Sequence, residues 1–104
     1  MSGLLKTLFG KKEAQSLSYK ASKVRLFIKP YCSWCHKAVH WLEDHGITYE
    51  SLDVVSNQAS FEEMIKLSGQ TLAPVIEVDG KVLADFGPDQ LERFWMKLGQ
   101  GSVQ

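Results

Sequence analysis

Residues 24–39 read VRLFIKPYCSWCHKAV, and this run joins two patterns of different period. Residues 24–28 are a short β-rich run, apolar except for Arg25, and are closed by Pro30, which predicts a short buried strand. Apolar residues then recur at helical spacing through residues 33–45, and Gly46 follows where a helix C-cap is expected. The residues expected to face the core from this helix are Trp34, Ala38, Trp41, Leu42 and His45.

The rest of the chain adds strand and helix signals in a regular order. Asp79-Gly80 lies between two apolar runs and predicts a tight hairpin turn. Ser60 and Glu63 have the spacing of a capping box, which predicts a helix from Phe61. The elements expected after the first helix are a strand at 49–53, a helix at 61–67, strands at 75–78 and 82–83, and a helix from Pro88 to Gly99. The order β-α-β-α-β-β-α predicts an α/β fold with a mixed four-stranded sheet and three helices.

Length and composition limit the class of protein. With 104 residues, of which 44% are hydrophobic, the chain is long enough for one globular domain with its own core. Two cysteines are too few for a disulfide scaffold of the small secreted kind. No apolar run reaches the roughly 18 residues of a membrane span, and 12 basic against 12 acidic side chains give no overall attraction to nucleic acid. We therefore expect a cytoplasmic protein with no transmembrane segment and no nucleic-acid partner.

The zero net charge conceals an asymmetry. Residues 1–23 carry five lysines and one glutamate, a formal charge of +4, which leaves −4 for the remainder. We therefore divide the chain into a basic arm and linker at residues 1–22, a domain at 23–99 and a tail at 100–104. The arm has leucines and a phenylalanine at helical spacing. This pattern is typical of a docking element for a membrane surface or partner, or more simply of a loosely packed terminus.

Cys32 and Cys35 carry the predicted chemistry because they lie where the first strand leads into the helix. A spacing of three puts both sulfurs on one side of the first helical turn, where unpaired N–H groups and the helix dipole favour a thiolate. A thiolate is the nucleophile in thiol–disulfide exchange. We expect Cys32, nearer the helix end, to attack a disulfide and Cys35, one turn deeper, to resolve the mixed disulfide. Lys29 adds positive charge near Cys32.

Three other interpretations of the pair fit the sequence less well. Two cysteines can serve as small apolar core residues, but a strand-to-helix junction is the context that redox pairs occupy. Cys32 to His36 also spells Cys-x-x-Cys-His, the c-type haem attachment motif, which predicts an export signal and a mostly helical host that the sequence does not indicate. His36 and His40 could join the thiols in a zinc site, but four ligands within nine residues point around the helix. We expect no metal site.

Pro74 is the second chemical marker. It interrupts an apolar run where a strand begins, which is one of the few places where a strand accepts proline. The simpler interpretation is a trans proline in an edge strand. Beside a Cys-x-x-Cys pair, the better interpretation is a cis-proline that exposes the backbone of Ala73 to an extended thiol peptide.

The sequence from residue 23 to residue 98 resembles a glutaredoxin. Lys29 to Cys35 is similar to the family's segment with a lysine, a tyrosine and the sequence Cys-Pro-Tyr-Cys. Residues 46–54 are similar to its second strand, and residues 68–74 are similar to its Thr-Val-Pro loop. Residues 79–81 are similar to its hairpin. The resemblance implies the thioredoxin fold, Cys32 as the nucleophile and a cis peptide bond before Pro74. It also implies disulfide-containing or glutathionylated proteins as substrates, with glutathione as reductant or co-substrate.

The chain departs from the family at three positions. Ser33 replaces the usual proline, and such variants can in some cases hold an iron–sulfur cluster with glutathione as co-ligand, although we expect no tightly bound cofactor. Trp34 replaces tyrosine and forms either a flat wall beside the thiol or part of a structural helix face. Gly87 stands where the family has an Asp or Ser that anchors the γ-glutamyl end of glutathione, so that anchor is lost unless Asp85 replaces it.

Residues 86–91 instead resemble the glutaredoxin-like hydrogen donors of ribonucleotide reductase, which take electrons from thioredoxin reductase. The sequence therefore predicts a thiol–disulfide oxidoreductase and leaves glutathione and thioredoxin reductase as alternative electron sources. The non-enzymatic alternative is a thioredoxin-fold binding module that docks through the basic arm. The residues expected to form the site are the catalytic Cys32 and Cys35 and, for glutathione, Lys29, Tyr31, Trp34, Ala73, Pro74, Asp85, Phe86 and Gly87.

Overall fold

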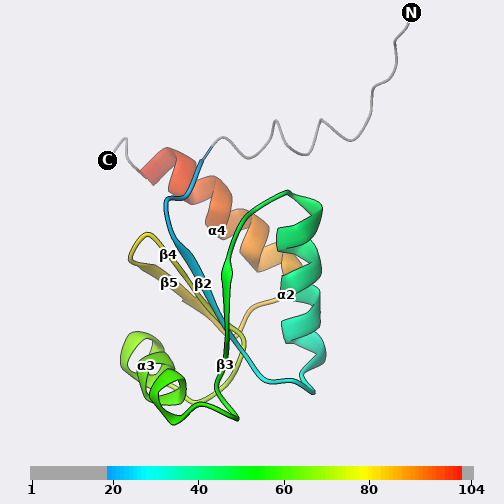
Figure 1. Ribbon diagram of the computed structural model, residues 1–104. Helices are drawn as coiled ribbons and strands as arrows, with labels where there is room; N and C mark the ends of the chain where they lie inside the picture. The colour runs from blue at the N-terminus through cyan, green and yellow to red at the C-terminus, as the bar shows by residue number, and fades with distance from the viewer. Residues whose placement is uncertain (1–18, 102–104) are drawn as a thin grey trace, which may run out of the picture.

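The computed structural model describes residues 19–101, and its elements follow the expected order (Figure 1). The elements are β2 (Val24–Ile28), α2 (Ser33–Asp44), β3 (Glu50–Asp53), α3 (Gln58–Ser68), β4 (Val75–Val78), β5 (Lys81–Ala84) and α4 (Pro88–Gly101). The four strands form one mixed sheet in the order β3-β2-β4-β5, which confirms the predicted architecture. Most of the basic arm, residues 1–18, and the end of the tail lie outside the described residues.

The central strand β2 organises the sheet. It pairs in parallel with β3, with Leu26 opposite Ser51, and α2 supplies the long connection that a parallel pair requires. On its other side it pairs antiparallel with β4, with Leu26 opposite Ile76. The predicted hairpin then joins β4 to β5 through Asp79 and Gly80, which both have positive φ, 50° and 91°. The end of β2 therefore lies in the middle of the sheet and leads directly into α2.

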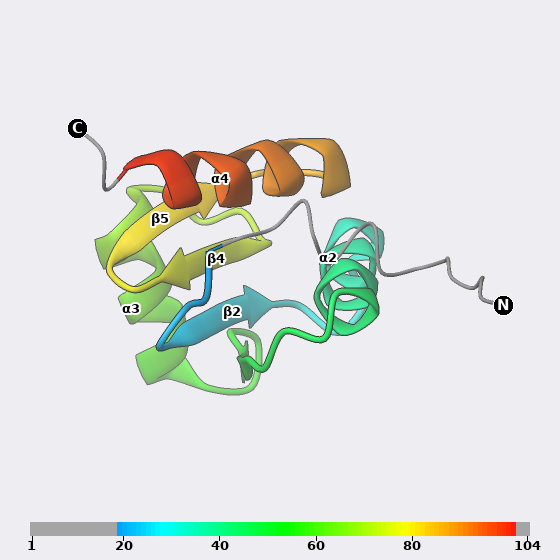
Figure 2. The same cartoon turned by 90° about the horizontal axis from the view of Figure 1, so that it is seen from above.

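Both faces of the sheet are covered by helices, with α3 on one side of the strands and α2 on the other (Figure 2). Leu26 and Ile76 contribute to the larger core with α2 and α4, where Trp95 is also buried. The neighbouring Phe27 points to the opposite face and packs with Met64 of α3 in a second cluster. This alternation is why β2 is apolar at every position except Arg25. No helix within residues 19–101 combines the length and apolar character of a membrane span.

Two helix boundaries differ from the prediction. Helix α3 begins at Gln58, because the Asn57 side chain caps it by accepting a hydrogen bond from the Ser60 N–H at 2.9 Å. The predicted start at Phe61 is wrong, since Ser60 lies inside the first turn with its side chain buried. Helix α4 continues to Gly101, so the predicted end at Gly99 is also wrong.

The segment before β2 is held against the domain by one carboxylate. Asp79 accepts hydrogen bonds from the Tyr19 hydroxyl at 2.6 Å and from the backbone N–H groups of Ser22 and Lys23. These bonds lower the pKa of Asp79 and raise that of Tyr19. Trp95 Nε1–H also donates to the Tyr19 carbonyl at 3.1 Å. The last residues of the expected linker therefore belong to the folded unit.

Candidate active site

Cys32 occupies the N-cap of α2. Its backbone is extended (φ −99°, ψ 115°), as an N-cap residue requires, and its Sγ accepts a hydrogen bond from the Cys35 N–H at 3.2 Å. Because the sulfur takes the capping position itself, an N–H group of the first helical turn is aimed at it. The Cys32 sulfur therefore lies at the positive end of the helix dipole.

Cys35 lies one turn deeper and is fully buried, whereas the Cys32 side chain is half-buried. Burial raises the pKa of the Cys35 thiol to about 12, and the hydrogen bond to Cys32 acts in the same direction. At neutral pH, Cys35 therefore stays a thiol and Cys32 is the sulfur that a partner can reach. This asymmetry matches the roles that the spacing predicts for the two cysteines.

The loop before β4 completes the thiol site. The peptide bond between Ala73 and Pro74 is cis, which confirms the expectation, and Pro74 is buried. The Cys32 thiol donates to the Ala73 carbonyl with a sulfur–oxygen distance of 3.8 Å. The Pro74 carbonyl in turn accepts from the Asp85 N–H at 3.1 Å, which ties the loop after β5 to the same place. Segments far apart in the sequence are thus brought together around Cys32.

The aromatic side chains beside the thiol point outward. Tyr31 is 98% exposed, and Trp34 is 51% exposed rather than part of the inner face of α2, so its predicted position in the core is wrong. Cys35, one residue further, is buried in its place. Lys37 lies 4.3 Å from the centre of the Trp34 ring, close enough for a cation–π contact. Trp34, two positions after Cys32, is therefore exposed to a partner that reaches this thiol.

The remaining predicted ligand residues fall into three environments. Lys29 is half-buried just after β2, and Asp85 is exposed with a positive φ of 57°. Phe86 is buried in the core with α2 and α4, so its side chain does not face a ligand. Gly87 is buried directly under the Trp34 ring, where an added Cβ would lie 2.9 Å from Trp34 Cζ3. The structure therefore brings Gly87 to Trp34 and separates Phe86 from the site.

Sequence reasoning missed three residues around this surface. Lys37 follows Trp34 by three positions, a helical spacing that could have identified the contact. Gln90 follows Gly87 by three, the spacing of an N-terminal cap, and its side chain accepts from the Gly87 N–H at 2.9 Å. Leu72, in the loop before Pro74, is 53% exposed, and no sequence signal marks it.

The described residues do not assemble a metal site. Within residues 19–101, no three His, Cys, Asp or Glu side chains gather closely enough to hold a metal ion. His36 is instead hydrogen-bonded through Nε2 to the Pro30 carbonyl at 3.0 Å. Of the two thiols, Cys32 is the one that a ligand can reach, because Cys35 is fully buried.

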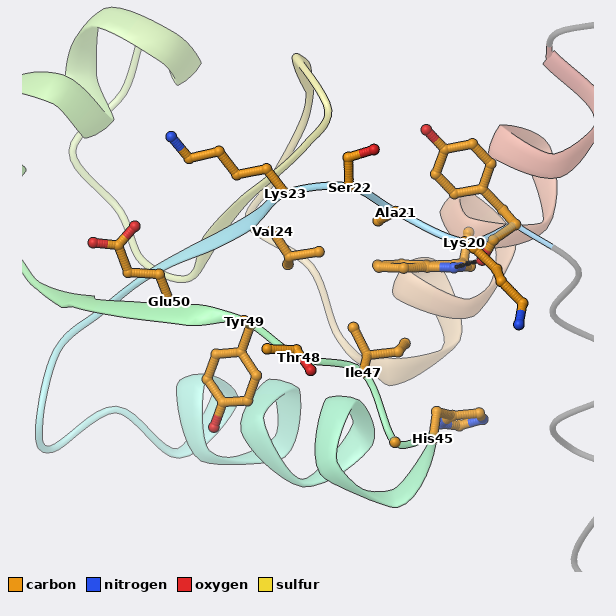
Figure 3. A pocket seen from close by; sticks show the side chains of 13 residues that line it. Lys20, Ala21, Ser22, Lys23, Val24, His45, Ile47, Thr48, Tyr49 and Glu50 are labelled. Carbon is orange, nitrogen blue, oxygen red and sulfur yellow. Dashed lines mark hydrogen bonds between the residues drawn. The ribbon is translucent and has the colours of Figure 1, made fainter.

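A groove lies away from the two thiols (Figure 3). It is a groove of about 610 Å³ between the segment that precedes β2 and the segment that precedes β3. Its lining residues include Tyr19, Ile47, Tyr49 and Trp95, and neither cysteine is among them. The groove is therefore separate from the surface around Cys32.

Comparison with known proteins identifies relatives of this chain in sequence. The protein-family model described as Glutaredoxin matches residues 24–83, more than half of the chain. A glutaredoxin-like 8.6 kDa protein of the rubredoxin operon of Clostridium pasteurianum is 29% identical over 67% of this chain and 93% of its own length. Glutaredoxin 3 of Escherichia coli is 37% identical over 58% of this chain and 72% of its own length.

A solved structure agrees in fold. The crystal structure of a glutaredoxin from Archaeoglobus fulgidus superposes with a TM-score of 0.63 at 17% identity. The match covers 68% of this chain and 83% of that chain. The β-α-β-α-β-β-α architecture described above is therefore the thioredoxin-like fold.

Proposed function

Because the chain belongs to the glutaredoxin family of thiol oxidoreductases, we propose that it reduces disulfide bonds in proteins through Cys32 and Cys35. The observation that carries this proposal is the difference between the two thiols. Cys32 caps α2 and lies 3.8 Å from the Ala73 carbonyl, at a surface that a partner can reach. Cys35 is fully buried, and burial raises its pKa to about 12.

The reaction then runs in two steps. The Cys32 thiolate attacks one sulfur of the target disulfide, forms a mixed disulfide, and releases the other sulfur as a thiolate that takes up a proton. Cys35 next loses its proton and attacks the Cys32 sulfur, which releases the second target sulfur as a thiol and forms the Cys32–Cys35 disulfide. The backbone at Ala73 is placed to pair with an extended segment of the partner beside the reacting sulfurs.

Glutathione is the first candidate for the electron source. Two molecules of glutathione would reduce the Cys32–Cys35 disulfide and leave as glutathione disulfide, and a glutathionylated protein would be a substrate of the same chemistry. Lys29 offers a cation for a glutathione carboxylate, and Ala73 offers backbone hydrogen bonds for its cysteinyl part. A compartment that keeps both thiols reduced, such as the cytoplasm, would suit this cycle.

A flavoprotein reductase such as thioredoxin reductase is the second candidate. The observation that favours it is Gly87, which offers no side chain to the γ-glutamyl end of glutathione, while the nearby Asp85 is acidic and exposed. In either case we propose that the protein works without a tightly bound cofactor. A freshly purified sample that is free of visible absorption would agree with this proposal, and a coloured one would contradict it.

The central experiment compares the two cysteines on a glutathionylated protein substrate. Cys32→Ser should abolish turnover, because the accessible nucleophile is lost. Cys35→Ser should retain part of it, because glutathione can resolve the mixed disulfide in place of Cys35. An equal loss in both variants would overturn the assigned roles. The protein would instead be a binding module if the wild type exchanges no thiol and Cys32→Ser binds the protein substrate with unchanged affinity.

A further inference from the structure

The start of α4 is built around the contact between Gly87 and Trp34. The Gly87 carbonyl accepts from the Leu91 N–H at 3.0 Å, so Gly87 is the N-cap of α4. Its backbone does not have the positive φ that calls for glycine. A Cβ at this position would instead lie 2.9 Å from Trp34 Cζ3 and 3.4 Å from Trp34 Cε3. Glycine is therefore needed here because the tryptophan ring rests on it.

This helix end is closed to an anionic ligand. The N-terminus of a helix ordinarily attracts carboxylates through its free N–H groups and its dipole. Here the Gly87 N–H donates to Gln90 Oε1 at 2.9 Å, and Pro88 has no N–H to offer. Asp89 places a negative charge in the first turn. The Trp34 ring packs on Gly87 at this helix end, and the Lys37 ammonium lies 4.3 Å from the centre of the ring.

Three large apolar side chains near Cys32 in the fold are exposed. Tyr31, Trp34 and Leu72 expose 98%, 51% and 53% of their surface, and they come from the turn before α2, from α2 itself and from the loop before β4. Exposed aromatic and aliphatic side chains gathered at a reactive centre are typical of a protein contact surface. Glutathione, which carries two carboxylates, would have to pair them with Lys29 or Lys37, because the exposed apolar side chains and Asp85 offer a carboxylate no partner.

We propose that Trp34, seated on Gly87, is a specificity-determining residue that selects a protein partner with an uncharged, apolar surface around its reactive sulfurs over the anionic tripeptide glutathione. This inference rests on the thiol–disulfide exchange proposed above and chooses between its two electron sources. Trp34 acts in two ways: it packs on the N-terminus of α4, which could otherwise hold a carboxylate, and it presents its own exposed face to the partner. The electrons then come from a protein dithiol.

Gly87→Ala tests this role with a single methyl group. The methyl adds no charge and needs no change of backbone conformation, but it would lie 2.9 Å from the Trp34 ring and 3.2 Å from Gln90 Oε1, so it displaces the ring and also crowds the Gln90 side chain. The assay reduces the Cys32–Cys35 disulfide with glutathione or with thioredoxin reductase and NADPH, and compares kcat/KM for the two. The wild type should favour the reductase. Gly87→Ala should raise the rate with glutathione roughly threefold to tenfold and lower the rate with the reductase by a similar factor.

A second variant separates the effect of the ring from a change in α4. Trp34→Ala removes the cover without touching the helix, and it should fold because Trp34 is exposed. It should shift both rates in the same directions as Gly87→Ala, and adding Gly87→Ala to it should change nothing further, since no ring remains to be displaced. Met96→Ala, an exposed apolar truncation two turns further along α4, is the matched control and should leave both rates unchanged.

The outcomes distinguish the two levels of the argument. Unchanged rates with glutathione in both Gly87→Ala and Trp34→Ala, or a wild type that prefers glutathione, would overturn the specificity role while thiol exchange stands. An additive effect in the double variant would overturn the mechanism of displacement. If the wild type exchanges with neither reductant and Cys32 does not react with a small aromatic disulfide, the proposed function itself is wrong.

Discussion

The reduced protein should lose stability in alkaline solution because Cys35 is buried. Burial raises the pKa of this thiol from an ordinary 9.0 to about 12. Between these two values the unfolded chain has released the thiol proton while the folded chain still holds it. The unfolded state then binds fewer protons, so the free energy of unfolding falls as the pH rises. The slope approaches about 1.4 kcal/mol per pH unit, and the sum over the interval is at most about 4 kcal/mol.

Cys35→Ala is the variant that isolates this contribution. Tyr19 and Tyr49 also have raised pKa values and titrate in the same range, but they do so in both proteins and cancel in the difference. Urea unfolding of the wild type and Cys35→Ala, followed by circular dichroism with a phosphine reductant present, gives that difference at each pH. The wild type should be more stable at about pH 8, by about 1 kcal/mol for the buried sulfur.

The sign of the difference should then change. As the pH rises from about 9 to about 11, the wild type should lose 2 to 3 kcal/mol relative to Cys35→Ala, at about 1.4 kcal/mol per unit. Cys35→Ala should therefore be the more stable protein at the alkaline end. A difference that stays constant across this range would refute the conclusion that the fold holds Cys35 protonated, and with it the assignment of Cys32 as the sole accessible nucleophile.

Three further substitutions test the parts of the fold that frame the site. Asn57→Ala should lower the free energy of unfolding by about 1 kcal/mol in urea titrations, because α3 loses its N-cap, whereas the neighbouring Ser56→Ala should not. Gly69→Ala should cost about 1 kcal/mol by the same measurement, because the C-cap of α3 has a φ of 75°. Asp79→Ala should free the segment before β2 and speed tryptic cleavage at its lysines. Because these hydrogen bonds lower the pKa of Asp79, its carboxylate holds the segment fully above the ordinary aspartate pKa of 3.8 and releases it as the pH falls below that value. In that acidic range, an acid protease should cleave the wild type as fast as it cleaves Asp79→Ala.

The fold was predictable where the deciding interactions are local. The apolar run of β2 and the turn at Asp79-Gly80 specify their structures from neighbouring residues alone. The start of α3 was not predictable in this way, because Asn57 and Ser60 are about equally good N-caps and their local energies do not separate them. The burial of Ser60 within the packed helix decides the question. A tertiary contact was needed, and the sequence pattern contains none.

The candidate site divides along the same line. Cys32 and Cys35 could be recognised because a helix end and a spacing of three are sufficient to assign their chemistry. Trp34 could not be placed, since it lies at helical spacing from the buried Trp41 and Ala38, while Cys35 fits the same inner face equally well. Helical periodicity alone does not choose between them. The contact between Trp34 and Gly87 distinguishes them, and Gly87 lies far from Trp34 along the sequence.

Gly87 shows most clearly why the electron source could not be read from the sequence. In the sequence, a glycine at this position shows only that an anchoring side chain is absent. That absence weakens the expected binding of glutathione but does not exclude it. In the structure the same glycine is the seat of the Trp34 ring, so the absent side chain has been replaced by a large apolar one from another helix. In thiol–disulfide exchange the three sulfurs must lie nearly in line, and Cys35 approaches Cys32 from the buried side. The sulfur of any partner must therefore lie on the exposed side of Cys32, so a selective contact with the exposed Trp34 ring would act on substrates and on reductants alike.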